Sequence, residues 1–130
     1  MPSIFTRIIN REISGHIVAE DENNIAFLDV NPLKKGHVLC VPKKEVSYIF
    51  DMDEDTYLNL HTFTKKVAKA VEAAVPCKRI GVAVIGLEVP HVHIHLIPLQ
   101  NISDIDFSKP KLSLSQEELA ETAYQIKKQL

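Results

Sequence analysis

The chain is short of cysteine, of net charge and of long apolar runs, and each shortage excludes a class of protein. It has two cysteines, Cys40 and Cys77, far apart in sequence. Cys40 lies in an apolar stretch, so a buried free thiol is expected rather than a disulfide, and no cysteine pair supports a structural metal site. The formal net charge of −2 gives no reason to expect nucleic-acid binding.

No apolar run approaches the about 18 residues of a membrane-spanning helix, and no signal peptide is recognised at the N-terminus. We therefore expect a cytoplasmic protein with no membrane partner. What is present is enough for one compact domain, because 130 residues with 45% hydrophobic content can bury a full core.

Half of the six histidines stand in one short row, His91, His93 and His95, with valine, isoleucine and leucine after them in alternation. A period of two indicates a β-strand, in which alternate side chains point to the same face. Three imidazoles should therefore share a face, each roughly 6–7 Å from the next, while the apolar residues enter the core.

Two kinds of chemistry fit such a row, because imidazole changes charge near neutral pH. One ring could attack an electrophile such as phosphorus while its neighbours bind the developing charge. Alternatively the row could hold a metal that activates water, with Glu88 as the nearest carboxylate and His37 joining from a neighbouring strand. The residues alone leave both open.

Hydrophobic spacing along the chain predicts an α+β domain with helices on a mainly antiparallel five-stranded sheet. Ser3 caps an expected short helix, and a long amphipathic helix is expected over residues 53–74. The form of a capping box at residues 115–118 predicts a C-terminal helix after a loop at 101–114. The expected strands are residues 17–20, 25–30, 37–42, 80–85 and 89–98.

The string HVHIHLI at residues 91–97 resembles the His-φ-His-φ-His-φ-φ signature of the histidine triad superfamily of nucleotide hydrolases and transferases. The segments SIFTRIINREI at 3–13 and EDENNIAFLDVNPLKKGHVLCVPKK at 20–44 are similar to its nucleotide-binding, phosphoramidase-like branch. The resemblance implies a five-stranded sheet that pairs into a ten-stranded homodimer. It divides the chain into a nucleotide-binding domain at 1–105 and an extension with a helix, packing on the same domain, at 106–130.

The resemblance also assigns roles to individual residues. His93 matches the nucleophile that attacks the α-phosphorus and forms a nucleotidyl-histidine intermediate, and His95 matches the residue on the phosphate oxygens. His91 and His37 match supporting histidines. Asp29 matches the carboxylate that accepts from both ribose hydroxyls. The apolar pocket around the purine base corresponds to Ile4, Phe5, Ile8, Phe27 and Val30.

The chain departs from the family pattern at two places. Many bacterial members bind zinc at four positions that are here Ser3, Thr6, Glu45 and His91. Three of those ligands are missing, so no metal and no cofactor are expected. Glu88 stands near the place of a family serine by the scissile bond, where its charge should repel anionic leaving groups.

Taken together, the sequence predicts an enzyme that hydrolyses a purine nucleoside phosphoramidate or related nucleotide, such as one that yields AMP. The alternatives are a dinucleoside polyphosphate hydrolase, a nucleotide-binding protein with weak turnover, and a metal-dependent hydrolase.

Overall fold

The computed structural model describes residues 2–130 and shows the predicted α+β architecture. The five strands form one sheet in the order β1-β2-β3-β5-β4, and every neighbouring pair is antiparallel. The elements follow the expected order, with two additional 3-10 helices: α1 Ile4–Ile9, β1 Ile17–Glu20, β2 Asn24–Leu28, β3 Val38–Pro42, η1 Ile49–Asp51, α2 Glu54–Ala74, β4 Arg79–Ala83, β5 Ile94–Leu99, η2 Ile102–Ile105 and α3 Gln116–Lys127.

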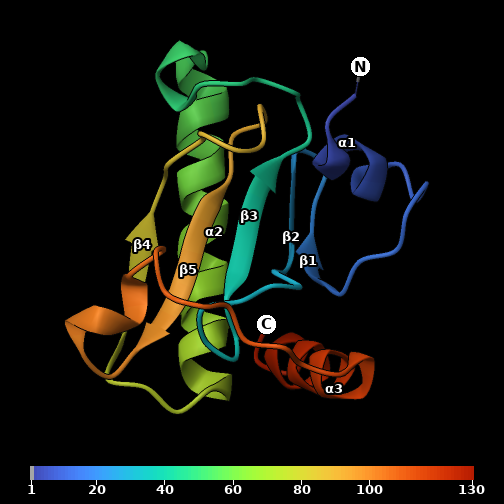
Figure 1. Cartoon of the computed structure of the whole chain (residues 1–130). Helices are drawn as coiled ribbons and strands as arrows, with labels where there is room; N and C mark the ends of the chain where they lie inside the picture. The colour runs from blue at the N-terminus through green and yellow to red at the C-terminus, as the bar shows by residue number, and fades with distance from the viewer. Residues whose placement is uncertain (1) are drawn as a thin grey trace.

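Helix α2 lies along one face of the sheet, and α3 packs beside it against β1 and β2 (Figure 1). Alternation along the central strands divides the core between the two faces. Val38 and Cys40 of β3 enter the cluster under α2 and α3, whereas Leu39 and Val41 enter a smaller cluster with Phe5 of α1. Both faces of β3 are therefore buried. The antiparallel pairing of β5 with β3 places the histidine-bearing strand next to this buried strand.

The helix ends follow local capping chemistry. Asp53 accepts a hydrogen bond from the Thr56 N–H at the start of α2, and Ser115 forms the predicted capping box with Glu118 at the start of α3. The apolar stripe of α3 is buried through Ile126, but Leu130 remains 58% exposed. Among residues 2–130, no helix combines the length and apolar character that crossing a membrane requires.

The fifth strand begins five residues later than the period-two pattern predicts, at Ile94 rather than at residue 89. Pro90 has no N–H for a ladder, and the Val92 N–H donates to the Val46 carbonyl (2.8 Å), in the segment after β3. The side-chain alternation nevertheless continues: Val92 lies in the α2 cluster and His91 is buried beside Phe5 on the opposite side. Strand β4 likewise ends at Ala83, two residues early.

Candidate active site

A cavity of about 380 Å³ lies on the α1 side of the sheet and collects residues from distant parts of the chain. A larger hollow of about 580 Å³ lies between β1 and α3, but His93 and His95 lie in the smaller one. Its walls come from α1, the end of β2, β3, β5, the loop before the histidine row and the segment after η2. The lining includes Phe5, Asp29, His37, Glu88, His93, His95, Phe107 and Lys111.

The orientation of His93 follows from one backbone contact. Its Nδ1 lies 2.7 Å from the carbonyl oxygen of His91. A carbonyl can only accept, so Nδ1 carries the proton, and the neutral ring has an unprotonated Nε2. The ring of Phe5 packs edge-on against it at 4.9 Å between centroids. His93 therefore has its basic nitrogen free for a nucleophilic role.

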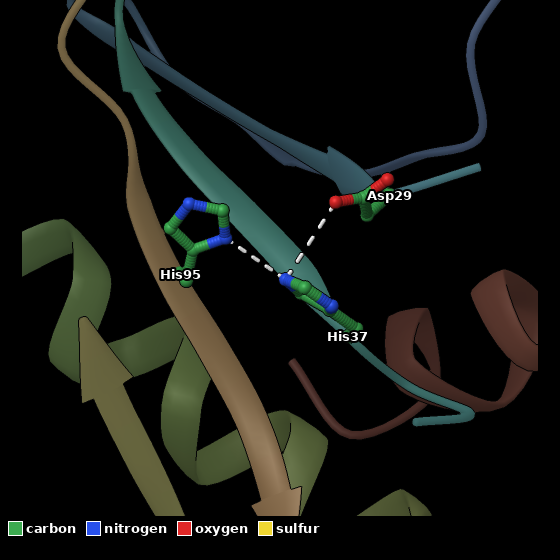
Figure 2. A group of neighbouring side chains, drawn as sticks. All are labelled: Asp29, His37 and His95. Atoms are coloured by element: carbon green, nitrogen blue, oxygen red, sulfur yellow. Dashed lines mark hydrogen bonds and ion pairs between the residues drawn. The ribbon is translucent and has the colours of Figure 1, made fainter. Parts of the chain in front are cut away.

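His37 and His95 form a second hydrogen-bonded chain, whose direction is set by Leu33. The Leu33 N–H donates to Nδ1 of His37 at 3.0 Å, so His37 carries its proton on Nε2. That N–H donates to Nδ1 of His95 at 2.9 Å (Figure 2), which places the proton of His95 on Nε2. Burial is the largest cause that lowers the pKa of His37 to about 3 and of His95 to about 4.

Both rings are therefore neutral at physiological pH, and His95 keeps an N–H donor on Nε2. The His93 and His95 rings lie 4.9 Å apart between centroids in an edge-on arrangement, closer than the roughly 6–7 Å expected along a flat strand. His93 therefore presents an unprotonated nitrogen, and His95, two residues later, presents an N–H donor. The pair can act on an electrophile that bears a polar oxygen: the first nitrogen attacks, and the N–H donates to the oxygen.

Asp29 follows β2 and points toward the same chain (Figure 2). One carboxylate oxygen accepts from the Asn31 N–H at 2.9 Å, and the other lies 3.7 Å from Nε2 of His37. Burial raises the pKa of the Asp29 carboxyl. Its remaining lone pairs can accept from hydroxyl groups.

Asp29, His37 and His95 have ligand atoms within 4.8 Å of one another, close enough for a metal ion. A metal binds an imidazole lone pair, however, and Nδ1 of His37 is already an acceptor for Leu33. Nε2 would have to lose its proton to bind the ion, leaving an imidazolate. The hydrogen bonding thus favours a proton-bearing His37 over a metal ligand, and the histidine row itself contributes only one member to this group.

His91 is fully buried and is held by a cluster of the positions that differ from the zinc-binding pattern. Its Nε2 lies 2.8 Å from the Pro42 carbonyl, so it carries the proton there, and its Nδ1 accepts from the Ser3 hydroxyl at 2.6 Å. Glu45 accepts from the Ser3 N–H and the Thr6 hydroxyl, at 2.8 and 2.6 Å. Burial is the largest cause that lowers the pKa of His91. Hydrogen bonds therefore join these four residues directly.

Replacing Ser3 with alanine should lower the free energy of unfolding by about 2 kcal/mol, since it leaves a buried imidazole nitrogen without its donor and removes the cap of α1. Urea denaturation of the two chains measures the difference. Ser14→Ala, at an exposed position, is the matched control and should change stability by less than about 0.5 kcal/mol. Equal stability of the Ser3 variant and the parent would mean that the cluster contributes nothing.

The structure brings most of the sequence-predicted site residues together. His37, His93, His95, Asp29 and Glu88 all line the cavity. His91 does not line it, but it contacts two residues that do: its carbonyl accepts from His93, and its ring packs against Phe5. Of the five residues predicted to surround the base, Ile4 and Phe5 line the cavity. The others lie elsewhere: Ile8 and Phe27 pack in the core cluster with Phe5, and Val30 is 51% exposed outside the lining.

The cavity is also lined by residues that the sequence did not single out, and two of them bear charge or an aromatic ring. Phe107 and Lys111 belong to the loop predicted over residues 101–114, which has no periodicity to indicate a buried or site-facing position. The ring of Phe107 packs against His95 at 4.8 Å and lies 6.3 Å from His37. Phe107 is the one aromatic residue of this segment, and that is the only signal that the sequence offers.

The sequence matches the model of the HIT domain family over residues 10–102. With the triad, the five-stranded sheet and this match in place, the chain belongs to the HIT family. An uncharacterized HIT-like protein of Methanocaldococcus jannaschii is 44% identical over 105 residues, which cover 73% of this chain and 77% of the relative.

Relatives with named activities and a solved structure agree with this assignment. The adenosine 5′-monophosphoramidase hnt1 of Schizosaccharomyces pombe is 32% identical over 78% of this chain and 77% of its own length. The crystal structure of a HIT-like protein from Bartonella henselae, 32% identical, superimposes with a TM-score of 0.85 over 98% of this chain and 96% of that one.

Proposed function

We propose that this protein is a nucleotide hydrolase that acts on the α-phosphate of a purine nucleoside phosphoramidate. Nε2 of His93 attacks the α-phosphorus and forms a phosphorus–nitrogen bond. The bond from phosphorus to the substrate amine breaks, and the amine leaves with the electron pair and takes a proton from solvent, to which the water of the next step returns one. Water then attacks the same phosphorus, the bond to Nε2 breaks, and the nucleoside monophosphate is released with His93 restored.

The observation that carries the proposal is the paired tautomers of His93 and His95. The His91 carbonyl leaves Nε2 of His93 unprotonated, while the chain from Leu33 through His37 puts a proton on Nε2 of His95. The first nitrogen is the nucleophile, and the second donates to an oxygen of the phosphate as charge develops in the transition state. Both are set by backbone groups and need no rearrangement before reaction.

The rest of the cavity suits a ribonucleotide. The Asp29 carboxylate accepts from the ribose hydroxyls, and Ile4 and Phe5 supply apolar surface for the base. The name of the Schizosaccharomyces pombe relative supports a phosphoramidate as the substrate class. A dinucleoside polyphosphate is the second candidate substrate, because the same nucleophile would cleave it. The cation Lys111, which lines the cavity, favours such an anionic ligand.

Trapping the covalent intermediate tests the proposal most directly. The protein is incubated with an adenosine phosphoramidate after exhaustive chelation, denatured above neutral pH, digested and examined by mass spectrometry. The expected result is an adenylyl group on the peptide that contains His93, and none in a His93→Ala variant. Turnover that disappears on chelation and returns with zinc would instead support the metal-dependent hydrolase.

We further propose that the chain forms a homodimer through β4. This strand lies at the edge of the sheet, and its Val82 is 61% exposed. Ile85, two residues after the strand, is 45% exposed and lines a hollow together with Phe50, which is 72% exposed. An exposed apolar edge strand is a template for pairing with a second chain. Sedimentation equilibrium of the parent should give twice the 14.6 kDa mass of one chain. The Val82→Lys variant should have the mass of a single chain. A parent that sediments as a monomer would exclude the pairing.

A further inference from the structure

The segment after η2 passes over the catalytic cavity, beyond the residues that the family model matches. The Leu112 N–H donates to the Pro32 carbonyl at 2.8 Å, which ties the segment to the turn after Asp29. Phe107 packs edge-on against His95. Lys111 lies between these two attachments. They fix the path of the backbone and hold Lys111 at the wall of the cavity.

The ammonium group of Lys111 is itself oriented by the segment. Its Nζ donates to the carbonyl of Phe107 at 2.8 Å and lies 3.4 Å from the carbonyl of Lys109, and it lies 5.8 Å above the centre of the Phe107 ring. An ammonium has three N–H donors. Two are directed at backbone carbonyls, which leaves one for a group inside the cavity.

The charges around the cavity make this cation necessary for an anionic ligand. Asp29 and Glu88 are carboxylates, and Lys111 is the only lysine or arginine among the lining residues of the described chain. His37 and His95 are held neutral by burial. Burial is the largest influence on these groups, raising the pKa of Asp29 and lowering the pKa of His37 and of His95. The charge of Lys111 is a smaller influence that acts to lower the pKa of all three, so it lies close enough to be felt at each of them.

We propose that Lys111 binds the phosphate of the nucleotide and supplies the positive charge that the neutral histidines lack. The inference rests on the proposed function, because it places the nucleotide phosphate beside His95. Lys111 offsets the two carboxylates, and Phe107 orients it through its carbonyl and its contact with His95. The negative charge of Glu88, by contrast, repels the same phosphate and weakens its binding. The C-terminal extension thereby becomes part of the substrate site.

Calorimetric titration with AMP and with adenosine separates charge recognition from the rest of the site, since the two ligands differ only in the phosphate. Lys111→Met should weaken AMP binding about tenfold, because a charge-assisted hydrogen bond at a partly exposed site is lost. Adenosine binding should change less than about twofold, and Lys111→Arg should restore most of the AMP affinity. Glu88→Gln should strengthen AMP binding.

Lys109→Met is the matched control, because Lys109 is an exposed neighbour that does not line the cavity; it should bind AMP as the parent does. The inference is overturned if Lys111→Met binds AMP like the parent, or loses adenosine and AMP equally. Failure of the proposed function looks different: the parent would then bind AMP in a Lys111-dependent way but form no adduct at His93. Adduct formation with Lys111-independent AMP binding would reject this inference alone.

Discussion

Hydrolysis of an adenosine phosphoramidate is expected to fall at least about 100-fold when His93 is replaced by alanine, as loss of a covalent nucleophile requires. The reason is that the His91 carbonyl leaves Nε2 of His93 unprotonated, whereas Nδ1 of His95 is engaged by His37 and Nε2 carries a proton. Only His93 therefore presents a lone pair to phosphorus. Steady-state kinetics with parent and variant give the ratio of kcat values.

The variant should keep its fold and its affinity for AMP, which circular dichroism and calorimetry check. His61→Ala is the control for loss of a histidine as such, because His61 is an exposed residue of α2 far from the cavity lining. It should leave kcat unchanged. Retention of more than about a hundredth of the parent activity in His93→Ala would remove His93 from the role of nucleophile.

The second large effect concerns the sugar. The parent should prefer an adenosine phosphoramidate to its 2′-deoxy analogue by roughly 10- to 150-fold in kcat/KM, the value of one hydrogen bond to a charged acceptor. Asp29 is partly buried, and one of its oxygens already accepts from Asn31. A deoxy sugar leaves the other oxygen with fewer donors in a setting where water replaces them poorly.

Asp29→Asn tests whether the preference arises at this residue. An amide presents one acceptor and one donor in place of two acceptors, so the ratio between the two sugars should shrink to a few-fold. If the parent hydrolyses both substrates equally well, Asp29 does not bind the ribose. If the preference exists but survives in Asp29→Asn, another residue reads the sugar.

Features that arise from neighbouring residues could be predicted from the sequence. Alternation put His91, His93 and His95 on the side opposite Val92 and Ile94, and this held even for the residues that precede the start of β5. The caps at Ser3 and Ser115 were equally readable, since a capping side chain bonds to a backbone group three residues away. The family motif added roles for the histidines that period and composition could not.

Other features depended on groups that meet only after folding. The protonation of each ring is set by a partner such as the Pro42 carbonyl or the Leu33 N–H, and no sequence pattern states where those groups will lie. The late start of β5 came from the hydrogen bond to Val46, and Ile8 and Phe27 turned out to pack behind Phe5 instead of lining the cavity.

The C-terminal wall of the cavity shows the same division most clearly. The start of α3 could be predicted from Ser115, because a capping box joins residues close in sequence. The aperiodic segment before it does not indicate that Phe107 packs on His95, or that Lys111 shares a cavity with two carboxylates. Those contacts join residues from different parts of the chain, since Asp29 follows β2 and His95 lies in β5. Tertiary structure alone decided them, because a loop takes its path from what it packs against and not from its own periodicity.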